Sequence, residues 1–188
     1  MLSTVTGVFY AKLRSLLTVI AHSAMFGDVQ ALAYRVDFHP WGLPRAIVLF
    51  ALEFRVPAMM IDEVVSAEVP CPVRHPALYG TVSRCMIHDP CEHRPDAQCR
   101  VGRSKGTCFR GFPQPIIPVT RVDAEHHTYY RRRERFSVER NGTVISDQWI
   151  VPYNPLLLVL FDCHLNVELS ARRAGEYWYR AELAVLLR

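Results

Sequence analysis

The chain of 188 residues has little lysine and no long uninterrupted apolar run. Only Lys12 and Lys105 are lysines among the 22 basic residues, so arginine provides most of the positive charge. The longest apolar runs, residues 46–54 and 156–161, fall short of the ~18–20 residues that a membrane span needs. The nine Gly and 13 Pro follow no period, which excludes a collagen-like chain. These absences predict a mixed globular protein with no membrane partner.

Composition and length favour one domain over residues 1–188. Hydrophobic residues make up 50% of the chain and charged residues 21%, which is close to the average for globular proteins and excludes wholesale disorder. The net charge is +4, but residues 100–140 hold ten Lys/Arg against four Asp/Glu, a local charge of +6. Such a stretch is typical either of nucleic-acid contact or of a solvated charged surface. Lys12 and Arg14 lie inside the first apolar segment, which argues against a cleaved signal peptide and predicts an intracellular protein.

The hydrophobic pattern predicts an α+β fold with a central antiparallel sheet and helices on one face. Apolar residues at helical spacing predict a helix over 9–24, and strands are expected at 29–38 and 46–54. The second strand is nearly all apolar, so we expect it to be buried on both faces. The other expected elements are helices at 62–68 and 75–87, a basic β-hairpin within 128–151 that turns at Asn141 and Gly142, a strand at 164–169 and a closing helix at 170–187.

An irregular, cysteine-rich insertion occupies residues 88–118. His88, Cys91, Cys99 and Cys108 fall within it, and four such ligands can close a tetrahedral zinc site in place of a hydrophobic core. His93 is an alternative fourth ligand, and reduced thiols or disulfides are the alternatives to a metal. The remaining cysteines are expected to be buried or inert thiols; these are Cys71, Cys85 and Cys163.

The order of several segments is that of a known family. The most specific are Met86-Ile87-His88-x-Pro90-Cys91 and Val151-Pro152-Tyr153-Asn154-Pro155, followed by Asn166-Val167-Glu168. Others are Gly42-Leu43-Pro44, Ser66-Ala67-Glu68-Val69-Pro70 and Tyr130-Arg131-Arg132-Arg133. Over residues 9–183 the chain resembles the replication-initiator (Rep) region of Helitron transposon proteins, the helitron helicase-like domain.

The resemblance implies a ferredoxin-like nuclease of the His-hydrophobic-His type that acts on single-stranded DNA. In that family, two His on a strand hold a divalent metal such as Mg²⁺ or Mn²⁺, and a Tyr attacks the phosphate. The metal stabilises charge on the phosphoryl oxygens, and the phenolate is the nucleophile. A helicase domain follows the Rep region in intact proteins of this kind.

This sequence departs from the family at both catalytic places. Arg45 and Ile47 stand where the family has its metal-binding His, and neither side chain can ligate a cation. Tyr177 matches the first catalytic Tyr, with Tyr179 as an alternative, whereas Ala181 replaces the second. We therefore expect the ancestral metal not to be bound and the chain not to be an enzyme.

Three hypotheses follow. The first is a degenerate or truncated Helitron Rep domain; no Walker A loop is present, so neither ATP nor a small-molecule substrate is expected. The second is a zinc-stabilised DNA-binding module without catalysis, nuclear if it acts on DNA, in which Arg131, Arg133 and Arg135 share one face of a strand with Arg132 opposite. The third is a zinc-stabilised fold with no retained partner.

Overall fold

The computed structural model describes residues 2–38, 42–52, 58–91, 99, 108–125, 127–170 and 182–187. Over these residues, helices and short antiparallel strands alternate in no regular order, so the fold is α+β as the sequence predicts.

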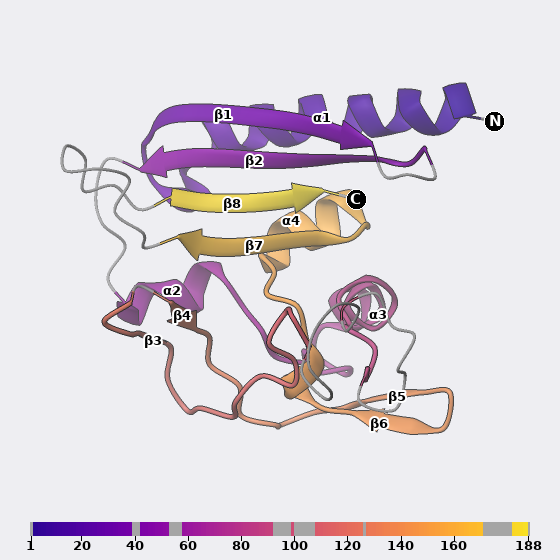
Figure 1. The fold of residues 1–188 in the computed structure, drawn as a ribbon, viewed down its shortest axis with the longest axis vertical. Coiled ribbons are helices and arrows are strands. Elements are labelled where there is room, and N and C mark those ends of the chain that lie inside the picture. Colours follow the sequence, from indigo (N-terminus) through magenta and orange to yellow (C-terminus); the bar gives the residue numbers. More distant parts are fainter. Residues whose placement is uncertain are drawn as a thin grey trace.

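The largest sheet has four antiparallel strands in the order β1-β2-β8-β7 (Figure 1). They are β1 (Val29–Phe38), β2 (Pro44–Leu52), β7 (Leu165–Ser170) and β8 (Glu182–Leu187). The last strand is therefore inserted between two segments that are more than a hundred residues apart in sequence. The expected pairing of the first two strands is confirmed, since Phe38 lies opposite Pro44 and Ala33 opposite Leu49.

Helix α1 (Leu2–His22) covers one face of this sheet, together with α4 (Pro155–Phe161) (Figure 1). Side chains alternate along a strand, so the even-numbered residues of β2 form one row; Ala46, Val48 and Phe50 are all buried. The apolar side of α1 belongs to the same core through Phe9, Leu13, Leu16 and Ile20. Lys12 Nζ donates to the carbonyl of Phe161 at 2.5 Å and so connects α1 to α4.

The opposite face of the sheet has no described helix or strand over it (Figure 1). The odd-numbered residues of β2 point there; Arg45 and Ile47 are half-buried, and Leu49 is 43% exposed. The expectation that this strand is buried on both faces is therefore wrong among the described residues.

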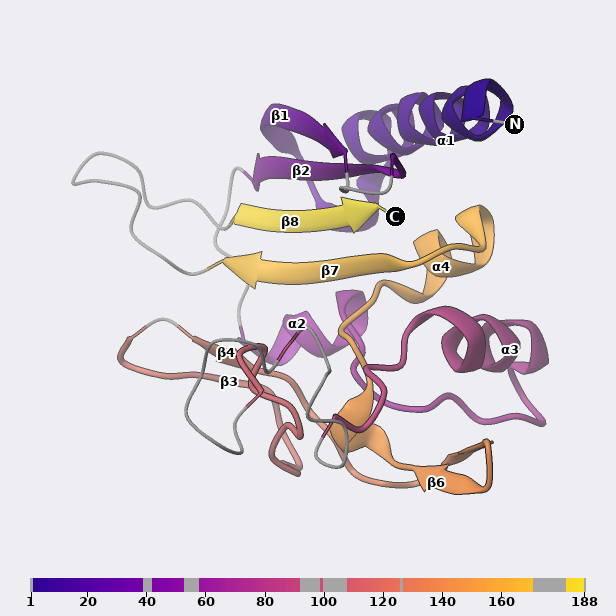
Figure 2. The same cartoon turned by 45° about the vertical axis from the view of Figure 1, so that its right-hand side comes forward.

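The other half of the chain lies beside the β7 edge of the sheet (Figure 2). It contains α2 (Ala58–Val64), α3 (Pro76–Cys85) and two small sheets, β3 (Arg121–Val122) with β4 (Thr128–Tyr129) and β5 (Val138–Arg140) with β6 (Thr143–Ile145). Short 3-10 helices occur at Ala24–Phe26 and Asp147–Trp149. Both halves share one buried core, which includes Phe9 and Val48 as well as Val82 and Tyr153.

Three predicted elements need correction. The helix predicted at 62–68 lies at Ala58–Val64 instead, and Ser66 forms a bridge with Tyr153. The β-hairpin within 128–151 is confirmed only around its turn, where Val138–Arg140 pairs with Thr143–Ile145; Thr128 and Tyr129 pair instead with β3. The predicted closing helix over 170–187 is wrong at its end, because Glu182–Leu187 is the strand β8. The backbone hydrogen bonds that β8 makes on both sides outweigh the helical preference of its Ala, Glu and Leu residues.

Helix α1 also departs from the sequence expectation about membranes. Its residues Thr4–His22 are long and apolar enough to cross a bilayer, judged by length and composition alone. In this fold its Phe9, Leu13, Leu16 and Ile20 pack into the core, so the same composition also fits a helix that covers a sheet.

Candidate metal centre

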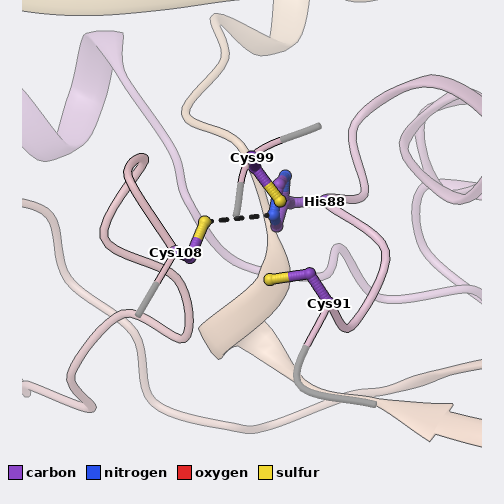
Figure 3. A group of neighbouring side chains, drawn as sticks. All are labelled: His88, Cys91, Cys99 and Cys108. Atoms are coloured by element: carbon purple, nitrogen blue, oxygen red, sulfur yellow. Dashed lines mark hydrogen bonds between the residues drawn. The ribbon is translucent and has the colours of Figure 1, made fainter. Parts of the chain in front are cut away.

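His88, Cys91, Cys99 and Cys108 converge in space (Figure 3). Their ligand atoms, one nitrogen and three sulfurs, all lie within 4.8 Å of one another. Tetrahedral zinc with Zn–S bonds of ~2.3 Å would hold its sulfur atoms roughly 3.8 Å apart. The four ligand atoms therefore need to move only slightly closer together to coordinate a metal ion. The three cysteines are nearly buried, with exposures of 3%, 8% and 8%. The group can therefore hold a metal ion, as the sequence predicts.

Backbone hydrogen bonds fix the segments that carry these ligands. His88 follows α3, and its N–H donates to the carbonyl of Trp149 at 2.8 Å. Phe109 N–H donates to the carbonyl of Cys99 at 2.9 Å, and Gly111 N–H donates to that of Cys108 at 2.9 Å. His88, Cys99 and Cys108 are thus each held by a neighbour that is distant in the sequence or by a tight turn.

An aromatic stack supports the imidazole from one side. The ring of His88 is stacked on Phe112 with 4.4 Å between centroids and is parallel to Trp149 at 6.2 Å. Ile145 and Trp149 are buried in the same small cluster as the three cysteines. This apolar surrounding limits the motion of the ring and keeps water from the ligand atoms.

The protonation of the group suits metal binding at two of its ligands. Burial, together with the charge of Arg110, lowers the pKa of His88, so its imidazole is neutral near pH 7 and can donate a lone pair. Burial would raise the pKa of Cys108, but N–H groups of Phe112 and Arg110 outweigh it and lower the pKa. Burial raises the pKa of Cys91 to about 12, so this thiol needs a cation beside it to become a thiolate.

The structure argues against one alternative to a metal, a disulfide. All six cysteines are among the described residues and form no disulfide. His93, the alternative ligand, lies outside the described residues. No second group of three or more metal-ligating side chains is found in the described part of the chain.

The positions that correspond to the family's metal-binding His lie on β2. Arg45 and Ile47 are two residues apart, so they share the face of the sheet that α1 does not cover. Arg45 Nη2 lies 3.5 Å from Oδ2 of Asp37, which also accepts from Arg35 at 2.9 Å. The Nε of Arg45 is buried without a hydrogen-bond partner. Tyr177 and Tyr179 lie outside the described residues, so their assignment stays a prediction.

The three arginines expected to contact DNA differ in their surroundings. Arg131 Nη1 lies 3.0 Å from Oδ2 of Asp62. Arg133 holds Glu68 through two hydrogen bonds of 2.7 Å, from Nε and Nη2, whereas Arg135 is exposed. Residues 131–137 form no strand apart from one bridge between Ile117 and Arg132, so the expected strand is wrong here. Two of the three arginines are engaged by carboxylates within the chain.

A buried ionic network next to these arginines was missed by sequence reasoning. Arg132 is 2% exposed, and its Nη1 donates to the carbonyls of Ala67 at 3.0 Å, Ile150 at 2.9 Å and Asp147. Burial lowers the pKa of Arg132 to about 10.

Asp147 is 1% exposed and accepts backbone N–H groups of Val69, Glu134 and Arg133 at 2.7, 2.7 and 3.2 Å. Burial raises its pKa in spite of these bonds. The only sequence signal for the network was the alternation that set Arg132 apart from its neighbours.

The segments that carry the family resemblance meet in this region. Ser66 pairs with Tyr153, whose hydroxyl donates to the carbonyl of Glu68 at 2.8 Å, and Ile87 pairs with Ile150. No protein-family model matches the chain, and no curated protein matches it.

Proposed function

We propose that this chain is a zinc-stabilised, catalytically inert domain of the Helitron Rep type. The observation that carries the proposal is the convergence of His88, Cys91, Cys99 and Cys108. Two of these ligands lie in the Met86–Cys91 segment on which the resemblance depends most. The ferredoxin-like arrangement of the family remains part of this proposal.

Zinc in such a site stabilises the fold and performs no chemistry. Four protein ligands leave no open coordination position, whereas a catalytic zinc keeps one for water or substrate. The described residues within 88–118 form no strand of their own, so a metal would supply the free energy that a hydrophobic core supplies elsewhere.

Two residues of β2, Arg45 and Ile47, account for the loss of nicking chemistry. A guanidinium stays protonated and cannot ligate a divalent cation, and the side chain of Ile47 has no lone pair. Asp37, a nearby oxygen donor, is already engaged by Arg35 and Arg45. Replacing two neutral imidazoles by a cation and a hydrocarbon therefore removes ligands and adds repulsion.

A cleavage assay tests this proposal. The purified chain with its zinc is incubated with single-stranded oligonucleotides and Mg²⁺ or Mn²⁺, and products are resolved on denaturing gels. We expect no metal-dependent product and no protein–DNA adduct. An adduct that Tyr177→Phe abolishes would overturn the proposal and assign the nucleophile, and one that only Tyr179→Phe abolishes would overturn it with the other assignment.

DNA binding without catalysis is the second candidate, and one observation favours it. Phe109 is 51% exposed directly after the ligand Cys108, with the guanidinium of Arg110 5.5 Å from its ring centroid. Arg121 lies in the same way over Tyr129 at 5.2 Å. The exposed ring of Phe109 and the half-buried ring of Tyr129, each beside an arginine, suit stacking of unpaired bases and contact with phosphates.

Fluorescence anisotropy with a labelled single strand tests this candidate. We expect the affinity to fall steeply as salt rises, because counterions are released on binding. Phe109→Ala should weaken binding, since stacking contributes ~1–3 kcal/mol per base. Affinity that is insensitive to salt and to Phe109→Ala would contradict it.

A further inference from the structure

A pocket of about 240 Å³ lies between the segment after α2 and the segment before β5. Cys71, Arg74 and His75 line it on one side, and Arg133 and Arg135 on the other. Its apolar wall includes Val69, Leu78 and Phe136. None of these residues belongs to the metal centre.

The pocket has an excess of positive charge. Glu68, its only acidic lining residue, is held bidentately by Arg133 and lies 3.4 Å from Arg131. Its charge is therefore already compensated. None of the ion pairs between described residues involves Arg74 or Arg135, and both of these lining residues are exposed. Two guanidinium groups thus face one pocket without a carboxylate partner among those residues.

The thiol of Cys71 responds to this environment. Hydrogen bonds from the backbone N–H of Arg74 and from its guanidinium lower the pKa of Cys71. Sequence reasoning expected an inert thiol, whereas the structure surrounds this sulfur with donors that favour negative charge. The donors that stabilise a thiolate are the same kind that bind an oxyanion.

We propose that this pocket binds a phosphate group. Its volume is below the ~300–1,000 Å³ of typical small-molecule sites, so it suits one tetrahedral oxyanion better than a whole cofactor. Arginine's planar fork matches phosphate oxygens bidentately, and Arg74 and Arg135 supply two such forks. The site depends neither on the zinc centre nor on nuclease ancestry.

Isothermal titration of the zinc-loaded chain with inorganic phosphate, at constant ionic strength, tests the proposal. We expect saturable binding that Arg74→Ala or Arg135→Ala weakens about tenfold each, as loss of a charge-assisted hydrogen bond implies. Arg14→Ala, at an exposed arginine on α1 outside the pocket, is the matched control and should leave binding unchanged. Absence of saturable binding, or equal loss in the control, would overturn the proposal.

The alkylation rate of Cys71 gives a second readout that does not require the arginine variants to fold. Phosphate should slow the reaction of this thiol with iodoacetamide, as followed by peptide mass spectrometry, while chloride at equal ionic strength should not. An alkylation rate unaffected by saturating phosphate would contradict binding at this place.

Single strands with and without a 5′-phosphate distinguish the source of the group. If only the phosphorylated strand protects Cys71 from alkylation, the bound group is a terminal DNA phosphate. If only inorganic phosphate protects Cys71, the bound group is a free anion. If none of these ligands protects Cys71, phosphate binding in the pocket is refuted. Zinc content and the cleavage assay decide the proposed function independently of that result.

Discussion

The Sγ of Cys108 lies 3.5 Å from Nε2 of His88, although 20 positions separate the two residues in the chain. Cys91 and Cys99 complete the group, and the ring of His88 is held against Phe112. The described residues of this insertion form no strand, and a contact of this kind between its ligands is what a metal-organised loop would provide.

Removing one metal ligand should destabilise the protein. We expect Cys91→Ser to lose the zinc and to lower the unfolding free energy by about 3 kcal/mol or more, which is roughly 10 °C in Tm for a chain of this size. Calorimetry and atomic absorption on the same samples measure both effects. Cys163→Ser is the control, because this thiol lies outside the group. Unchanged zinc content and Tm in Cys91→Ser would speak against a structural metal.

The ion pairs of Glu68 predict a specific acid sensitivity. Partial burial would raise the pKa of Glu68, but Arg133 and Arg131 outweigh it and hold the folded-state pKa below its ordinary value. A lowered pKa means that the carboxylate stabilises the fold above its unfolded pKa, and that this stabilisation is lost as the pH falls through the folded value.

Glu68→Gln should therefore cost about 1–3 kcal/mol near neutral pH and progressively less in acid. Urea unfolding of the variant and the wild type across about pH 3–7 gives this difference. Glu63→Gln, at an exposed position on α2, should show no such trend. A difference that stays constant with pH would exclude the ion pairs as its cause.

Asn154 joins two helices and should be sensitive to substitution. Its Oδ1 accepts from Leu157 N–H at 2.9 Å and caps α4, while its Nδ2 donates to the carbonyl of Val64 at 2.8 Å. We expect Asn154→Ala to cost about 2–3 kcal/mol, because a cap and a buried hydrogen bond are both lost. Asn154→Ser keeps the cap and should cost less. If chemical denaturation gives the two variants the same free energy of unfolding, the cap does not contribute separately from the hydrogen bond to Val64.

Restoring imidazoles on β2 should restore a cation site only in part. Side chains two residues apart on a strand point to the same side, so Arg45→His combined with Ile47→His would place two ligands on the open face. We expect the double variant to bind Mn²⁺ more tightly than the wild type in a titration followed by electron paramagnetic resonance. Equal Mn²⁺ affinity would mean that these positions do not form a site.

Local sequence patterns predicted most of the elements near the N-terminus, because the apolar residues at periodic spacing are the ones that pack into the core. Phe9, Leu13, Leu16 and Ile20 recur at helical spacing and form the buried side of α1. The turn residues Asn141 and Gly142 correctly placed the tight hairpin, where both adopt positive φ. In these cases the local preference and the tertiary environment favour the same structure.

The C-terminal strand and the arginine network could not be predicted from local patterns. The segment Glu182–Leu187 is rich in helix formers but lies between β2 and β7, and a pattern within six residues does not reveal two distant partners. Arg131, Arg132 and Arg133 are adjacent in sequence, yet two bind carboxylates and the other binds buried carbonyls. Which of three identical side chains becomes buried depends on Glu68 and Asp147, and their positions come only with the fold.

X-ray absorption at the zinc K-edge of the purified, unlabelled chain tests the metal centre most directly. The structure predicts one zinc per chain with three sulfur ligands at ~2.3 Å and one nitrogen at ~2.0 Å, from Cys91, Cys99, Cys108 and His88. Absence of zinc, or a zinc surrounded mainly by oxygen, would contradict the metal centre and the proposed function built on it.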